Sequence, residues 1–151
     1  MSSEYKKNFL DAAKSIDEEA YKRLKFIFWN HAIKIKSEPK LMGLAFLETI
    51  KQDRLEKGVF LVNNGADINF QDDQGYTALM YATEVGNGEL VRELLSAGAN
   101  PMLTDNQNQW TAKQHAEFSG YGGIYNMISG YEENWITMIN DQLSKKNPSL
   151  K

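Results

Sequence analysis

The chain lacks cysteine altogether and has two histidines, His31 and His115, among its 151 residues. Without cysteine there is no disulfide bond, thiolate metal site, iron–sulfur cluster or thiol nucleophile, which removes most metal and triad chemistry. The sequence also lacks an apolar run near the ~18 residues of a membrane span, and its start lacks the apolar segment of a secretory signal. We therefore expect a cytoplasmic protein that uses no metal and no cofactor.

Proline is scarce as well, with three residues, and no long Gly/Ser stretch or low-complexity segment marks a linker. Apolar residues make up 42% of the chain and charged residues 25%, which is the composition of one compact folded domain. We expect residues 1–151 to form a single domain.

What the sequence does contain is an internal repeat. The segment 65–69 (Gly-Ala-Asp-Ile-Asn) recurs at 98–102 (Gly-Ala-Asn-Pro-Met). Thr77 recurs as Thr111, one position later than this interval predicts, so one residue is inserted within 106–109, where we expect a turn. A fixed period of about 33 residues is the signature of a repeat array.

Each repeat predicts a pair of short helices. Thr77 and Thr111 can cap the first turn of a helix, and Gln114 completes a capping box with Thr111. Apolar residues at helical spacing within 79–82 and 90–95 give each helix one apolar face. Glycines that favour the left-handed conformation follow the helices at Gly65, Gly86, Gly98 and Gly120. Such a pair is too small to bury its face alone, so it must stack on a copy of itself.

The segment 73–82 (Asp-Gln-Gly-Tyr-Thr-Ala-Leu-Met-Tyr-Ala), followed by Leu90-Val91, Leu94-Leu95 and 98–100 (Gly-Ala-Asn), resembles an ankyrin repeat. The resemblance implies an all-α solenoid of helix-turn-helix units with short β-turn or hairpin loops and capping helices at both ends. The family's usual Thr-Pro-Leu-His is replaced here at 77–80 (Thr-Ala-Leu-Met) and at 111–114 (Thr-Ala-Lys-Gln).

Outside the clear repeat the register is less regular. Lys57 and Gly58 fall where the clear repeat has Leu90 and Val91, so we interpret that unit as degenerate. We expect a lengthened connection over 29–40 that ends at Pro39. The predicted units are a capping pair (1–40), a degenerate repeat (41–72), the clear repeat (73–105), a C-terminal repeat (106–130) and a terminal capping helix (131–144).

In ankyrin proteins, partners usually meet the concave face made by the hairpin tips and the first helices. The resemblance carries this binding role to Asp73, Gln74, Tyr76, Tyr81, Glu84, Val85, Asn106, Gln107, Asn108, Trp110, His115 and Phe118. Large aromatic side chains among polar neighbours often anchor protein interfaces. The alternative for Trp110 and Phe118 is that they pack under the C-terminal helix and fill the core.

Charge is unevenly distributed along the chain. Residues 1–40 carry nine Lys/Arg against six Asp/Glu, whereas residues 41–151 carry eight against fourteen. The acidic part disfavours nucleic acid and favours a partner with a basic surface, although acidic side chains also serve solubility alone. The basic, aromatic segment 22–29 can suit a membrane or RNA, but we expect its aromatics to cover the first repeat instead.

We therefore predict a monomeric, non-enzymatic module that binds another protein and neither membrane nor nucleic acid. The small array suggests a protein that holds or neutralises one partner, as an inhibitor or scaffold. A secreted effector that mimics host scaffolds is the rival hypothesis. A small-molecule sensor or hydrolase that uses a groove around His115 is a weaker one, because His115 has no nucleophile motif to serve.

Overall fold

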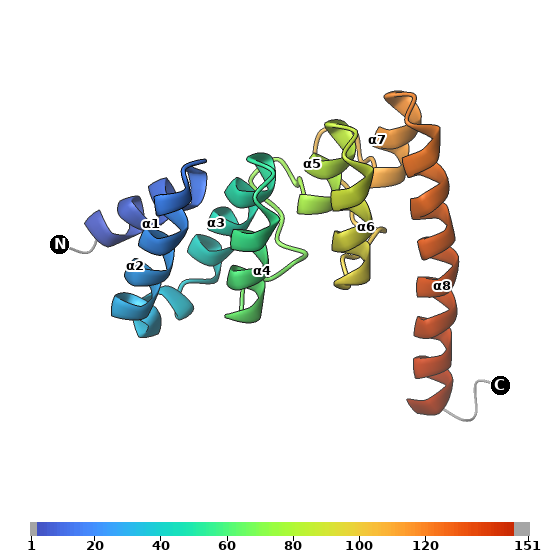
Figure 1. Cartoon of the computed structure of the whole chain (residues 1–151). Helices are drawn as coiled ribbons and strands as arrows, with labels where there is room; N and C mark the ends of the chain where they lie inside the picture. Colours follow the sequence, from blue (N-terminus) through green and yellow to red (C-terminus); the bar gives the residue numbers. More distant parts are fainter. Residues whose placement is uncertain (1–2, 147–151) are drawn as a thin grey trace.

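The computed structural model describes residues 3–146 and confirms an all-α array. Its helices follow one another in a row from the N-terminus to the C-terminus (Figure 1). They are α1 (Glu4–Lys14), α2 (Glu18–Lys36), α3 (Pro39–Lys51), α4 (Leu55–Asn63), α5 (Ala78–Glu84), α6 (Gly88–Ser96), α7 (Ala112–Phe118) and α8 (Gly122–Lys146).

Successive helices pair, and the pairs stack on one another. Helix α1 packs on α2 and α3, α3 on α4 and α5, and α5 on α6 and α7, while α8 covers α6 and α7. The buried side chains form one continuous core that runs from Phe9 to Ile128. This is the stacked arrangement that the repeat requires, because each pair hides its apolar face against its neighbours.

The predicted helix starts and stops are confirmed. Thr77 Oγ1 accepts a hydrogen bond from the Met80 amide over 3.2 Å, and Thr111 forms a capping box with Gln114. All four predicted turn glycines have positive φ, for example 71° at Gly86. A Cβ at Gly86 would lie 2.8 Å from the ring of Tyr121, so both the backbone conformation and the close contact require glycine there.

The degenerate unit keeps the repeat register. Helix α4 occupies the positions one repeat before α6, with buried Lys57 at the position of Leu90. Lys57 Nζ donates hydrogen bonds to the carbonyl oxygens of Ala12, over 3.1 Å, and of Ser15. Lysine therefore takes a core position by capping the C-terminal end of α1, and its burial lowers the pKa of Lys57 below the ordinary value.

Two predicted boundaries are wrong. The connection expected over 29–40 is mostly helix, because α2 continues to Lys36 with a kink at His31, where φ is −126°. Pro39 is then the first residue of α3, a position where its missing amide hydrogen costs no helical bond. At the other end, no separate helix begins at residue 131, because α8 runs without a break through Gly130 and past the end of α6 (Figure 1).

The expectation that the aromatics of α2 cover the first repeat holds for one ring and fails for two. Phe28 is fully buried, but Phe26 is 70% exposed and Trp29 64% exposed. Among the helices within residues 3–146, none is both long enough and apolar enough to cross a bilayer.

Candidate functional site

Five rings from two successive repeats lie in one row beside α5 and α7. Ring centroids are 5.1 Å apart for Tyr81 and Tyr76, 5.3 Å for Tyr76 and His115, and 5.5 Å for His115 and Trp110. The Trp110 and Phe118 centroids follow at 5.1 Å. We call these five residues the aromatic row.

The row follows from the repeat. Trp110 in the second unit takes the position of Tyr76 in the first, and His115 takes the position of Tyr81. Both spacings equal the spacing between the two capping threonines, Thr77 and Thr111. Because α5 packs on α7, equivalent side chains come side by side. Phe118 occupies the position of Glu84 and extends the row by one further ring.

The hairpin tips that carry Tyr76 and Trp110 are fixed by two aspartates. Asp72 Oδ1 accepts from the amides of Gln74 and Tyr76, over 3.0 and 2.9 Å. Asp105 Oδ1 accepts from the amides of Gln107 and Asn108, over 2.8 and 2.6 Å. Such Asx turns hold the loop backbone without help from a strand.

The two tips also contact each other. The Asn106 amide donates to the Gln74 carbonyl oxygen over 2.8 Å, and a Cβ at Gly75 would lie 2.7 Å from the Asn106 nitrogen. An isolated bridge joins Thr104 to Thr111 across the second tip. The inserted residue predicted within 106–109 is absorbed in this tip, where Gln109 has a φ of 59°.

Carboxylates hold the polar ends of the rings. The Tyr81 hydroxyl donates to Asp72 over 2.6 Å, and the Tyr76 hydroxyl donates to Glu84 over 2.8 Å. Burial, followed by the bond to Glu84, raises the pKa of Tyr76 to about 12. Burial, followed by the bond to Asp72, also raises the pKa of Tyr81. Both phenols therefore stay protonated and remain donors at neutral pH.

His115 lies between two carboxylates. Its Nε2 is 2.9 Å from Asp105 Oδ2, and its Nδ1 is 3.4 Å from Glu84 Oε1. Burial alone would raise the pKa of Asp105, but the Asn108 amide, the His115 ring and the Gln107 amide hold it below its ordinary value. With 4% of its surface exposed, His115 is the buried member of the aromatic row and packs between Tyr76 and Trp110.

The row presents apolar surface to solvent at one end. Phe118 is 79% exposed, so the alternative in which it packs under the C-terminal helix is wrong. Val85, at the end of α5, is 71% exposed, while Tyr76 and Trp110 are half-buried. The other predicted binding residues at the tips are exposed: Asp73, Gln74, Asn106, Gln107 and Asn108.

Sequence reasoning missed the residues that position the rings. Asp72 and Asp105 were not predicted, although an aspartate that opens each hairpin tip is the signal for an Asx turn. Lys51 was also missed; its Nζ lies 4.5 Å from the Tyr81 ring centroid and closes the far end of the row. The described residues contain no group of three or more histidine and carboxylate side chains that could hold a metal ion.

Comparison with known proteins identifies the family. Residues 48–134 match a family model described as ankyrin repeats in three copies. The chain belongs to the ankyrin-repeat family. Ankyrin repeats generally serve to bind other proteins, and the aromatic row lies within the matched residues.

Relatives share the repeats within different proteins. The human mitochondrial disaggregase is 31% identical over 106 residues, which cover 69% of this chain and 14% of that protein. The calmodulin-binding transcription activator 6 of Arabidopsis thaliana is 41% identical over 66 residues, covering 40% of this chain and 8% of that protein. An ankyrin-repeat protein of Acanthamoeba polyphaga mimivirus is 33% identical over 90 residues, covering 60% of this chain and 55% of that protein.

Proposed function

We propose that this ankyrin array binds a basic segment of a partner protein through the aromatic row and the hairpin tips beside it, without catalysing a reaction. The arrangement of the rings in the aromatic row is the main support for this proposal. Its rings are held in place by carboxylates, and it ends in the exposed side chain of Phe118.

The row has the character of an interface core. Partly covered rings of Tyr76 and Trp110 next to exposed Phe118 supply contact area with few rotatable bonds. The phenols are already hydrogen-bonded to Glu84 and Asp72, so little side-chain freedom is lost when a partner arrives. An exposed Phe118 contributes little to the fold, and a partner would shield it from water.

Charge favours a basic partner. Between residues 60 and 141 the sequence has two Lys/Arg and eleven Asp/Glu. At the row, the Glu84 side chain is 40% exposed. At the neighbouring tip, the Asp73 side chain is 90% exposed and pairs with the exposed Lys40 over 3.2 Å. Such a field attracts cationic side chains and speeds their encounter, while it repels phosphate backbones.

A holding role, as an inhibitor or scaffold, fits this geometry better than a hydrolase or sensor centred on His115. The His115 ring is buried, and both of its nitrogens face carboxylates, so no nitrogen is directed at a solvent-borne substrate. Its place within the row accounts for it as a support of Tyr76 and Trp110.

The proposal is tested by affinity capture from native lysate with the full chain immobilised. We compare the wild-type chain with Phe118→Ser, and use Ile139→Ser on the far half of α8 as the matched exposed control. Partners identified by mass spectrometry should be retained by the control and depleted by Phe118→Ser. If Phe118→Ser and the control capture the same proteins equally, the aromatic row is not the binding surface.

A further inference from the structure

Helix α2 carries two apolar stripes on opposite sides. One stripe is buried against the array and consists of Ala20, Leu24, Phe28 and Ile35. The other is exposed and consists of Phe26, Trp29 and Ile33, spaced three and four residues apart, with Ile33 88% exposed. We call this second set the α2 stripe. Because its side chains are mostly in water, it adds little to the stability of the fold.

Positive charge is concentrated on the same helix. Helix α2 has five Lys/Arg and two Glu, a net charge of +3, although the whole chain has a net charge of −3. Within residues 3–146, Lys25, Lys34 and Lys36 form no ion pair, whereas Lys22 pairs with Glu19. The rest of the chain therefore carries a net charge of −6, and the basic charge lies on the helix that carries the α2 stripe. Lys25 Nζ and Lys36 Nζ lie 4.2 and 5.6 Å from the ring centroids of Tyr21 and Phe28.

We propose that the α2 stripe docks this protein on an anionic membrane surface. Aromatic and branched apolar side chains among lysines are the pattern of helices that lie in the lipid interface rather than crossing it. Each lysine near an anionic leaflet strengthens binding about fivefold, and the effect is screened by salt. The sequence-based expectation of no membrane partner rests on pairing of Glu18 and Glu19 with Lys22 and Arg23 and on burial of the aromatics. The Lys22–Glu19 pair is present, but burial fails for Phe26 and Trp29.

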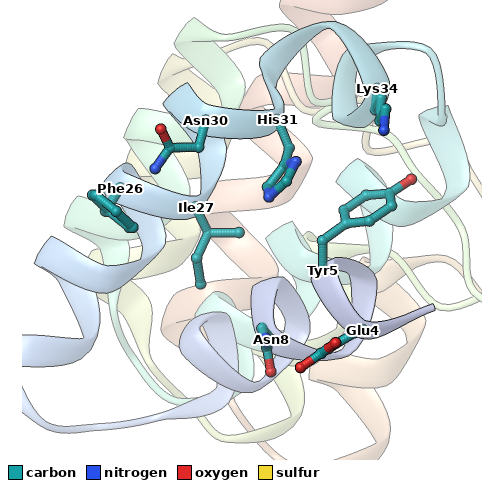
Figure 2. Close-up of a pocket in the computed structure, with 8 residues that line it drawn as sticks. All are labelled: Glu4, Tyr5, Asn8, Phe26, Ile27, Asn30, His31 and Lys34. Carbon is teal, nitrogen blue, oxygen red and sulfur yellow. The ribbon is translucent and has the colours of Figure 1, made fainter. Parts of the chain in front are cut away.

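A groove beside the stripe helps to decide between a membrane and an acidic protein helix. Figure 2 shows the first of two adjoining hollows between α1 and α2, each of about 580 Å³. Glu4 and Lys34 line this hollow, and Asp11 and Arg23 line the next, so the groove has no excess positive charge that would select an acidic helix. Trp29 and Ile33 line neither hollow, so a helix in the groove would leave them exposed, whereas a flat bilayer can cover them.

The charge distribution also orients the molecule. An anionic surface attracts α2 and repels the remaining net charge of −6, so the array should point away from the lipid. The aromatic row lies on α5, α7 and their hairpin tips, away from α2 along the array (Figure 1). A membrane-docked molecule would therefore keep the aromatic row free for a partner.

The test is co-sedimentation of the full chain with vesicles of phosphatidylcholine alone or mixed with phosphatidylserine, at low and high salt. The wild-type chain should pellet with the anionic vesicles at low salt and much less with neutral vesicles or at high salt. Phe26→Ser/Trp29→Ser should abolish pelleting, and Lys25→Glu/Lys36→Glu should weaken binding by at least ~25-fold. Circular dichroism should show that both variants remain folded.

Matched controls come from α8. Ile139→Ser/Leu143→Ser removes two exposed apolar side chains, and Lys145→Glu/Lys146→Glu reverses two exposed lysines. Both should pellet like the wild-type chain. The proposal is overturned if the wild-type chain stays in the supernatant, if neutral vesicles bind it equally, or if the α2 variants pellet unchanged. Binding of soluble polyglutamate through the α2 stripe, with no vesicle binding, would assign the surface to an acidic protein instead.

Discussion

The side chain of Lys57 donates a hydrogen bond to the carbonyl oxygen of Ala12, 45 residues earlier in the chain, over 3.1 Å. The bond ties α4 to the C-terminal end of α1, where helix carbonyls lack partners within the helix. Lys57 thus takes a core position that leucine has in the clear repeat. Its aliphatic stem is buried, and its ammonium group lies at the C-terminal end of a helix.

The lowered pKa of Lys57 predicts a pH dependence. In the unfolded chain the Lys57 ammonium group stays protonated up to about pH 10.5, whereas in the folded chain it loses its proton at a lower pH. The contribution of Lys57 to the free energy of unfolding therefore rises with pH between these two pKa values. As pH rises from neutral toward 10.5, the free energy of unfolding should therefore increase more for the wild-type chain than for Lys57→Met. Urea titrations of both proteins measure the difference, and parallel pH profiles would contradict the assignment.

Tyr76 predicts the opposite slope at higher pH. Its folded pKa of about 12 lies above the ordinary value of 10.0, so stability from the protonated phenol is complete below pH 10 and is lost as pH rises to 12. In Tyr76→Phe, the free energy of unfolding should decrease less between pH 10 and pH 12. Unfolding free energies across the window test it, and tyrosinate absorbance should show Tyr76 ionising late. An unchanged slope in Tyr76→Phe would rule out this origin.

Asp105 should be a stability determinant of the second hairpin tip. Its fully buried side chain accepts from the Gln107 and Asn108 amides and faces His115, so Asp105→Ala should cost about 2–4 kcal/mol in unfolding free energy. Asp73→Ala, which removes an exposed carboxylate on the neighbouring tip, should stay within about 0.5 kcal/mol of the wild-type chain. Equal effects of the two variants in urea unfolding would show that Asp105 does not fix the tip.

Much of the fold could be predicted from sequence because the repeat places capping and turn residues at fixed intervals. Thr77, Thr111 and the turn glycines act within a few residues of themselves, so local chemistry decides their conformation. Lys57 could not be interpreted in this way. Its partners lie in α1, and only the stacking of the units brings them within reach.

The extent of α8 was unpredictable for a related reason. Gly130 and the apolar residues after it suggest a break followed by a new helix, but the covering contacts of α8 on α6 and α7 favour one continuous segment. Lys113, which stands at a usual leucine position, forms an ion pair with the buried Glu132 of that same helix. A sequence pattern does not reveal such a pairing before the two helices are placed together.

The candidate site was predictable in its residue types rather than in its organisation. The resemblance pointed to Tyr76, Trp110 and Phe118, but not to the order of the rings. The supporting roles of Asp72 and Asp105 depend on how two neighbouring tips meet, so they emerge once the repeats are stacked.

Phe118 should contribute to binding with little effect on stability. Because the ring is 79% exposed, Phe118→Ser should change unfolding free energy by no more than about 0.5 kcal/mol. Thermal unfolding followed by circular dichroism checks this. A large loss of stability would mean that Phe118 packs more tightly than its exposure indicates, and the variant would no longer report on binding alone.

Binding through the aromatic row can be measured as the dissociation constant of the captured partner for the wild-type chain, Phe118→Ser and Ile139→Ser, by calorimetry at low and high salt. Binding through the row predicts at least a ~10-fold weaker complex for Phe118→Ser, an unchanged one for Ile139→Ser, and weaker binding of the wild-type chain at high salt. Equal affinities for all three proteins, insensitive to salt, would contradict it.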